Sequence, residues 1–282
     1  MEGLEVTYDN FFKQLIQDLL KGCEIQPDTS VGKLPLKIDL LIKCHQKSAE
    51  PATIPLLEAR LTQLNLIEYK SSHDIPKKQD LAKLIGYLGL YCDQHRQGVR
   101  EIITQFTLWY ITANRPPFFD ALLEELILTE TDVRGLYQLR VPFLCPYFLL
   151  VINELDISEE NLPLLLLSSG KTLRNTIRMI LQKGGITEPL LEKYLSLAYL
   201  INYKDVCEMT EIQSALPESV KKNIKHAIKD IGIKEVIHLI GLGEVIKEVG
   251  LGEVIKEVGL EEVIKIAGPE EVEKILHKLK KK

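Results

Sequence analysis

The chain has 282 residues, of which 45% are hydrophobic and 27% are charged, and its formal net charge is −5. This composition excludes a chain that is disordered throughout and is ordinary for a globular protein large enough to hold more than one domain. The net charge gives no global attraction to nucleic acid, although an acidic protein can still carry a local basic patch.

No apolar run in the sequence reaches the length of about 20 residues that a membrane-spanning helix needs. The first residues also lack the order of basic, apolar and small residues that marks a secretory signal peptide. We therefore expect a cytoplasmic protein without a membrane partner.

The five cysteines are far apart in the sequence and odd in number. These spacings indicate neither a disulfide framework nor a zinc site with paired cysteines. We expect all five to be reduced thiols: Cys23, Cys44, Cys92, Cys145 and Cys207.

The first elements of the chain predict a helix followed by two strands. "YDNFFKQLIQDLLKG" (residues 8–22) has apolar residues at helical spacing and ends at a glycine. After a turn-rich stretch, "PLKIDLLIKC" (residues 35–44) alternates apolar and polar residues, as a half-buried strand does. "LTQLNLIEYK" (residues 61–70) predicts the next strand.

Further along, "QDLAKLIGYLGLYCDQH" (residues 79–95) predicts a helix despite its two glycines, which weaken it. "QFTLWYITAN" (residues 105–114) predicts a buried strand, and residues 136–155 predict two more strand-like pieces. Local strand pairing combined with a helical crossover predicts an α/β fold with a mixed central sheet flanked by helices.

The second half of the chain reads differently from the first. From about Ser158 the patterns are helical, which predicts an α/β domain over residues 1–157 and a helical region over residues 158–229. Residues 230–282 form a tail in which glycine recurs with a strict nine-residue period. The recurring glycines are Gly232, Gly241, Gly250, Gly259 and Gly268.

Each repeat unit carries apolar residues on one helical face, and two units, "GLGEVIKEV", are identical. At about 100° per residue, nine residues place the next apolar face on the opposite side of a straight helix. The tail is therefore either one helix contacted on both sides or a series of short helical turns that bend at the glycines. It is a candidate for homo-oligomer assembly, and a spacer without a specific role is the alternative.

Candidate catalytic residues lie at the end of the second predicted strand. Glu68 and Lys70 are two residues apart and therefore point to the same face of a strand, about 6.6 Å from each other. Asp39 lies in the preceding strand, so pairing of the two strands would bring together two carboxylates and one ammonium group. Such a cluster can hold Mg²⁺, while the lysine stabilises negative charge on a phosphate. The reaction that suits this chemistry is phosphodiester hydrolysis.

The spacing alone also fits a simpler interpretation. Asp39 can be a solvated residue, and Glu68 with Lys70 a surface ion pair that contributes about 0–1 kcal/mol. The long loop between the two predicted strands leaves their register open.

Four segments read together, "YDNFFKQLI", "KIDLLIK", "NLIEYKSSHD" and "LAKLIGYLGLY", resemble the PD-(D/E)XK nuclease superfamily. Within it, the chain is similar to the recombination-promoting nuclease/putative transposase family, in which a D-x-x-F-K helix precedes a D strand, an E-x-K strand and a tyrosine-containing helix. The resemblance covers roughly the first half of the chain. Ile38 stands where the superfamily name has a proline.

The resemblance implies a restriction-endonuclease-like core and a role for each matching residue. Asp39 and Glu68 would bind Mg²⁺ or Mn²⁺, and Lys70 would be the catalytic lysine. Asp9 would be an accessory metal-binding acid, for which Glu5 is a nearby competitor. On the following helix, Lys83 and Tyr87 would line the substrate groove; for Tyr87, a core position is the alternative.

The function implied is a metal-dependent DNA endonuclease, and a role in recombination would follow from the resemblance alone. An RNA substrate is not excluded. Two other functions stay open: a binding protein that keeps the nuclease fold without turnover, and an assembly protein whose working part is the repeat tail.

Overall fold

The structure is a computed structural model that describes residues 8–31, 36–45, 53–140 and 145–182, together with isolated residues between 194 and 273. The chain divides into two compact units, Tyr8–Gln182 and the remaining residues. The helices and strands with defined bounds all belong to Tyr8–Gln182. Most of the predicted helical region (158–229) and repeat tail (230–282) lies outside the described residues, and those predictions stay predictions.

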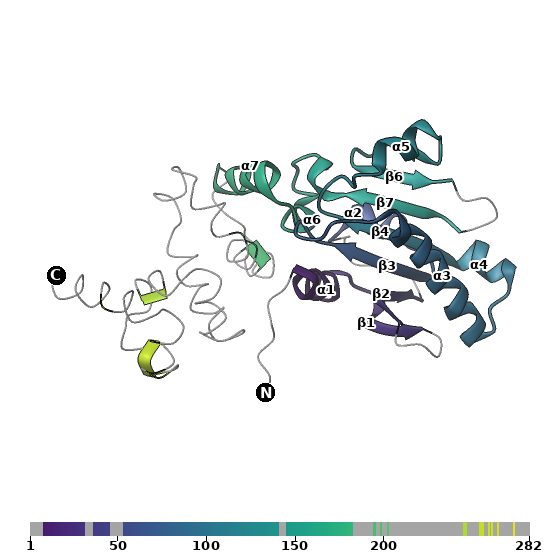
Figure 1. Cartoon of the computed structure of the whole chain (residues 1–282), viewed down its shortest axis with the longest axis horizontal. Helices are drawn as coiled ribbons and strands as arrows, with labels where there is room; N and C mark the ends of the chain where they lie inside the picture. The colour runs from purple at the N-terminus through teal and green to yellow at the C-terminus, as the bar shows by residue number, and fades with distance from the viewer. Residues whose placement is uncertain are drawn as a thin grey trace. The chain divides into compact units, whose positions relative to one another are not determined.

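A seven-stranded mixed sheet forms the centre of this unit (Figure 1). The α/β class with a mixed central sheet is therefore confirmed. In spatial order the strands are β1 (Cys23–Val31), β2 (Leu36–Cys44), β3 (Leu64–Lys70), β4 (Phe106–Thr112), β7 (Tyr147–Val151), β6 (Leu136–Leu139) and β5 (Leu128–Glu130).

The two sides of the sheet are antiparallel and its middle is parallel. Strands β1, β2 and β3 pair in antiparallel fashion, as do β7, β6 and β5, whereas β3, β4 and β7 run parallel. A parallel connection needs a crossover, which α3 (Lys78–His95) and α4 (Val99–Gln105) provide between β3 and β4. The ends of β3 and β4 consequently lie at the same edge of the sheet.

The other helices of the unit are α1 (Tyr8–Leu19), α2 (Pro55–Glu58), α5 (Phe119–Glu124), α6 (Leu162–Leu165) and α7 (Gly170–Gln182), with a short 3-10 helix η1 (Ile152–Glu154). Within the described segments, no helix combines the length and the apolar character that a membrane crossing requires.

Helices α1 and α3 cover opposite faces of β3. Phe12 of α1 stacks on Tyr69 with ring centroids 4.2 Å apart. Leu84 of α3 belongs to the buried cluster that contains Leu66. Because neighbouring side chains of a strand point to opposite faces, Tyr69 faces α1 while Leu66 and Glu68 face α3.

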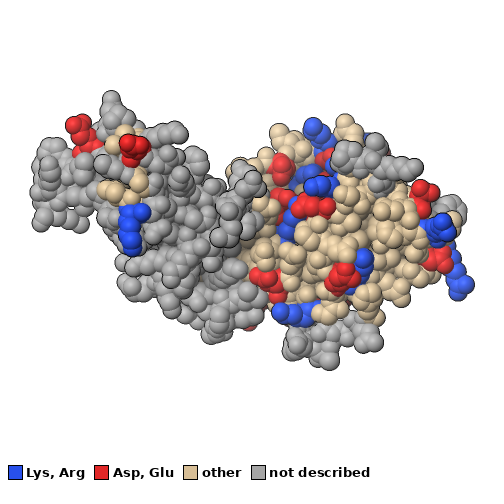
Figure 2. All heavy atoms as spheres, turned by 90° about the horizontal axis from the view of Figure 1, so that it is seen from below, with Lys and Arg blue, Asp and Glu red and all other residues tan. Residues whose placement is uncertain are grey.

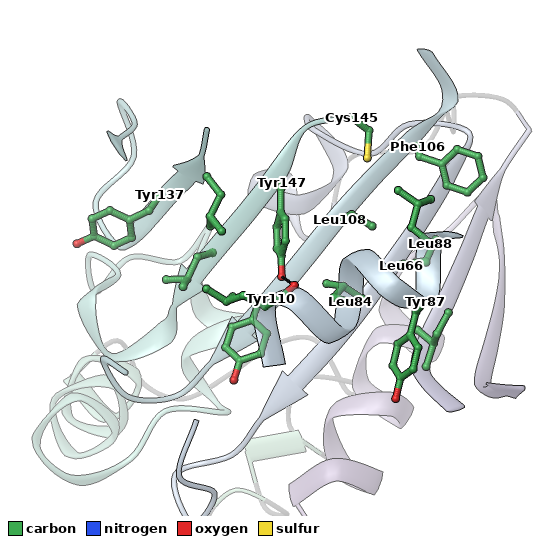
Figure 3. Close-up of a cluster of buried hydrophobic side chains, with 14 of the residues drawn as sticks. Leu66, Leu84, Tyr87, Leu88, Phe106, Leu108, Tyr110, Tyr137, Cys145 and Tyr147 are labelled. Carbon is green, nitrogen blue, oxygen red and sulfur yellow. Dashed lines mark hydrogen bonds between the residues drawn. The ribbon is translucent and has the colours of Figure 1, made fainter. Parts of the chain in front are cut away.

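The buried cluster beneath α3 fixes the helix on the sheet (Figure 3). Leu84, Tyr87 and Leu88 of α3 lie against side chains of β3, β4 and β7, among them Leu108. The Tyr147 hydroxyl of β7 also donates a buried hydrogen bond of 3.0 Å to the Leu81 carbonyl of α3. The start of α3 is thereby held above the strands that carry the candidate site.

The prediction of five reduced thiols is wrong for two of them. Cys23 and Cys44 face each other in the β1–β2 register, with Cα atoms 4.4 Å apart, and form a disulfide. The residues of β1 read as a turn-rich stretch in the sequence, so no strand partner was predicted for Cys44. Cys92 and Cys145 are free and buried, and Cys207 lies outside the described residues.

Candidate active site

Strand pairing brings Asp39 of β2 beside Glu68 of β3. The antiparallel register runs from Lys43 opposite Leu64 to Leu40 opposite Ile67. Beyond that last pair, Asp39 Oδ2 accepts a hydrogen bond from the N–H of Tyr69, the residue after Glu68. The pairing that the sequence left open thus brings Asp39 to the carboxyl end of β3.

Asp39 is partly buried and is held by the backbone of β3. Its Oδ2 accepts a hydrogen bond of 2.8 Å from the Tyr69 N–H. Burial and the charge of Glu68, with a smaller contribution from Asp9, raise the pKa of Asp39 to about 7, although the Tyr69 N–H and Lys13 act in the opposite direction. The charges of the Asp39 and Glu68 carboxylates thus repel each other within the fold.

Glu68 is 3% exposed, which is unusual for a carboxylate. Its Oε1 accepts a hydrogen bond of 2.9 Å from Lys70 Nζ and lies 3.6 Å from Lys83 Nζ. Its Oε2 is buried and has no hydrogen-bond partner within the described part of the chain. Buried charged oxygens normally have a hydrogen-bond or ionic partner. Oε2 is therefore the oxygen of this site that is available to bind a cation.

Lys70 and Lys83 both stay charged beside Glu68. Burial acts to lower the pKa of Lys70, but the hydrogen bond and charge of Glu68 outweigh it and the pKa is raised. Burial also acts to lower the pKa of Lys83, but the hydrogen bond with Tyr87 and the charge of Glu68 outweigh it, and the pKa is raised. Lys83 is 44% exposed and therefore open to a ligand from solvent, whereas Lys70 is 23% exposed.

Tyr87 belongs to the core as well as to the surroundings of the site. It is 3% exposed and lies in the buried cluster beneath α3 (Figure 3). The Lys83 ammonium lies 5.1 Å from the centroid of its ring. The Tyr87 ring thus packs against the Lys83 ammonium. Contact of Tyr87 with substrate stays a prediction.

Two residues of the site, Asp80 and Tyr110, were not predicted from the sequence. Tyr110 of β4 pairs with Glu68 in the parallel register, and its hydroxyl donates a hydrogen bond of 3.3 Å to Asp80 Oδ2 of α3. Asp80 also accepts a bond of 2.9 Å from the Lys77 N–H at the start of α3. An acidic residue three positions after a helix start is a recognisable signal. Tyr110 gives no such signal, because every residue of its strand is buried.

Asp9 of α1 forms a hydrogen bond with a lysine of the same helix. Its Oδ2 accepts a bond of 2.7 Å from Lys13 Nζ, and the same ammonium donates a bond of 2.8 Å to Asp28 Oδ1 of β1. The part of Asp9 as an accessory metal ligand stays a prediction. Glu5, its competitor, lies outside the described residues.

The donor set fits a hard cation that keeps part of its hydration shell. Within the described residues, no group of three or more His, Cys, Asp or Glu side chains is arranged to hold a metal ion. The site offers two carboxylates, Asp39 and Glu68, with Oε2 of Glu68 unpartnered. Mg²⁺ in proteins is commonly held by one or two carboxylates plus waters and substrate phosphates.

The site lies where ligands commonly bind in an α/β sheet. Glu68 and Lys70 end β3, and Lys70 pairs with Thr112 at the end of the parallel strand β4. In α/β sheets, ligands bind outside the carboxyl ends of the strands.

No protein-family model, curated protein or solved structure matches the chain in the three comparisons.

Proposed function

We propose that the protein is a metal-dependent nuclease that hydrolyses phosphodiester bonds of DNA with Mg²⁺ or Mn²⁺. The observation that carries the proposal is the convergence of Asp39, Glu68 and Lys70 at the carboxyl end of β3, with Oε2 of the buried Glu68 left unpartnered. Two adjacent carboxylates that repel each other are stabilised by a divalent cation between them.

Each residue has a distinct part in the proposed reaction. Asp39 and Glu68 would hold the ion, which would supply positive charge at the scissile phosphate and lower the pKa of bound water. Lys70 donates a hydrogen bond to Oε1 of Glu68, which leaves Oε2 of Glu68 for the ion. Its ammonium group also stabilises negative charge that develops on the phosphate.

The substrate part of the proposal depends on local lysines rather than on an extended basic surface. In Figure 2, basic and acidic side chains are interspersed over the described part of the face shown. Lys83 is the more exposed ammonium beside Glu68 and is the group we assign to a phosphate of the substrate. DNA rather than RNA is proposed on the family resemblance.

A binding protein that keeps this arrangement without turnover is the second candidate. It is favoured by one observation, the absence of a third acid grouped with Asp39 and Glu68 among the described residues. Such a protein would bind the ion and DNA without cleaving the chain. An assembly function of the repeat tail is compatible with either candidate.

Cleavage of supercoiled plasmid in Mg²⁺, Mn²⁺ or EDTA tests the proposal. We expect the intact protein to nick the plasmid only with metal, and we expect Glu68→Ala and Lys70→Ala each to lower the rate about 100-fold or more. Lys21→Ala is the matched control and should cleave as the wild type does. Lys21 is exposed and lies near Cys23, which pairs with Cys44 at the end of β2 away from Asp39.

The result that contradicts the proposal is an absence of cleavage by folded wild-type protein with either ion. In that case, metal-dependent retention of labelled DNA in a gel-shift assay identifies the binding protein. Cleavage that persists in Glu68→Ala would instead place the nuclease activity elsewhere in the chain.

A further inference from the structure

The loop that connects β3 to α3 exposes an isoleucine next to the candidate site. The loop spans residues 71–77 and begins directly after Lys70, the last residue of β3. Its Ile75 is 76% exposed, more than any other large hydrophobic side chain in the described part of the chain. A single exposed apolar side chain is common on protein surfaces. The surroundings of Ile75 therefore decide whether it has a role.

The first half of the loop is held in a fixed shape. Ser71 is 5% exposed, and both its N–H and its hydroxyl donate to Asp74 Oδ2, at 2.9 Å and 2.8 Å. The Asp74 N–H donates in turn to the Ser71 carbonyl at 3.3 Å. The His73 ring lies against Tyr8 of α1, with ring centroids 4.9 Å apart. The exposed position of Ile75 is thus set by a supported loop, whose one acid is occupied by Ser71.

The end of the loop is attached beside Glu68. The Lys77 N–H donates to Asp80 Oδ2 at 2.9 Å, and the Tyr110 hydroxyl donates to the same oxygen at 3.3 Å. Tyr110 is the partner of Glu68 in the parallel register of β3 and β4. Both ends of the loop are therefore joined to the strand ends that carry the candidate site.

Two lysines at the start of α3 add positive charge next to Ile75. Lys77 and Lys78 are exposed, and within the described residues neither ammonium group has an ion-pair partner. By contrast, Lys70 Nζ and Lys83 Nζ lie 2.9 Å and 3.6 Å from a Glu68 oxygen. A phosphate can bind Lys77 or Lys78 without breaking an existing ion pair, so these two groups suit the backbone of a nucleic acid.

We propose that residues 71–78 form a DNA-contacting element, in which Lys77 and Lys78 bind backbone phosphates and Ile75 packs against base edges in a groove. Apolar side chains make such contacts with bases, while lysines bind the phosphates around them. This inference rests on the DNA substrate of the proposed function. It adds substrate contacts made by residues that do not hold the ion.

Binding of a fluorescently labelled DNA duplex to the full-length protein in EDTA tests the inference without cleavage. Anisotropy titrations at several salt concentrations give the affinity and its salt dependence. Lys77→Ala and Lys78→Ala should each weaken binding and reduce the slope of log affinity against log salt by about 0.9, the value for one phosphate contact. Ile75→Ser should weaken binding about tenfold with an unchanged slope, because an apolar contact releases no counterions.

Two substitutions far from the loop are the matched controls. Val99 is 68% exposed on α4, which leads into the start of β4 at the edge of the sheet away from the site. Val99→Ser should therefore bind DNA as the wild type does. Lys21→Ala should also keep the affinity and the slope of the wild type. All five substituted side chains are exposed, and the unfolding transition of each variant checks that it is folded.

Affinities of the three loop variants within about twofold of wild type would overturn the inference. Losses in the lysine variants alone would overturn the part assigned to Ile75, and an equal loss in Val99→Ser would overturn it as well. A folded wild type that binds no duplex would overturn the inference together with the DNA substrate. Failure of the proposed nuclease activity alone has a different signature, which is loop-dependent binding of DNA without metal-dependent cleavage.

Discussion

At the scale of single residues, the candidate site is a set of charges held together by the backbone. Asp39 is fixed by the Tyr69 N–H, and Glu68 is fixed by Lys70. Neither arrangement removes the repulsion between the two carboxylates, which, together with burial, raises the pKa of Asp39. The metal-free protein therefore carries an electrostatic strain that a neutral side chain or a cation would relieve.

The first prediction concerns Asp39→Asn in EDTA. The pKa of Asp39, about 7 in the folded state, lies above the ordinary value of 3.8. The folded state consequently binds this proton more tightly than the unfolded state, and the free energy of unfolding falls as pH rises through this window. Asparagine is neutral and avoids the cost of burying an ionised carboxylate beside Glu68. At pH 8 the variant should therefore be more stable than the wild type by about 1–3 kcal/mol, a range lowered to allow for the partial exposure of Asp39.

Urea denaturation at pH 8 and at pH 4.5 measures this difference. Most of the gain should disappear at the lower pH, where Asp39 of the wild type is largely protonated in the folded state. Asp132→Asn is the control, because Asp132 forms an exposed pair with Arg60 and its loss should change stability by about 0.5 kcal/mol or less at either pH. A gain that does not depend on pH would contradict the explanation.

The second prediction compares the two lysines of Glu68. Lys70→Met leaves a 3% exposed carboxylate without its hydrogen bond and should lower the free energy of unfolding by about 1.5–3 kcal/mol. Lys83→Met removes a more distant and more exposed ammonium and should cost about 0–1 kcal/mol. Equal losses in denaturant titrations would show that Lys70 is not the principal partner of Glu68.

At the scale of elements, the position of α3 determines the site. Asp80 and Lys83 are carried by this helix, which is held on the sheet by its buried leucines and by the bond from Tyr147 to Leu81. Gly89 lies in the middle of α3 on its exposed side, with open space where a Cβ would lie. This glycine therefore lowers the stability of the helix only through backbone entropy.

The third prediction follows from the different surroundings of two glycines. Gly89→Ala should raise the free energy of unfolding by about 0.5–1 kcal/mol. Gly135→Ala should lower it by about 2 kcal/mol or more, because Gly135 has a positive φ of 81° and a Cβ there would lie 2.8 Å from the Val151 carbonyl oxygen. Thermal unfolding of both variants measures the contrast, and similar effects would contradict it.

At the scale of the whole molecule, the compact unit Tyr8–Gln182 contains every described residue assigned to the site. The nine-residue repeats lie outside this unit in the sequence. The proposed chemistry and the proposed assembly role thus concern separate parts of the sequence, and they can be tested separately.

The fourth prediction is that deletion of the chain from Gly232 onward changes the oligomeric state while Tyr8–Gln182 stays folded. Light scattering gives the mass of the assembly, and Mn²⁺ titration reports whether the site is intact. An unchanged number of subunits would count against an assembly role of the tail. Loss of the unfolding transition would show that the first unit needs the deleted residues.

The sequence by itself determined the type of several elements in the unit Tyr8–Gln182, although it predicted a turn-rich stretch where β1 lies. The helical spacing in residues 8–22 and the alternation in residues 35–44 are local patterns, and both predicted the observed type of element. The α/β class followed from the order of such elements. Glu68 and Lys70 were predicted neighbours because residues two apart in a strand share a face.

Only the tertiary structure decided which distant groups meet. The hydrogen bond from the Tyr69 N–H to Asp39, the approach of Asp80 to Tyr110 and the Cys23–Cys44 disulfide all join separate elements. A local pattern specifies which face a side chain lies on but not what lies opposite, because that depends on the pairing and packing of segments far apart in the chain. The bonds of Lys13 across to β1 belong to the same class.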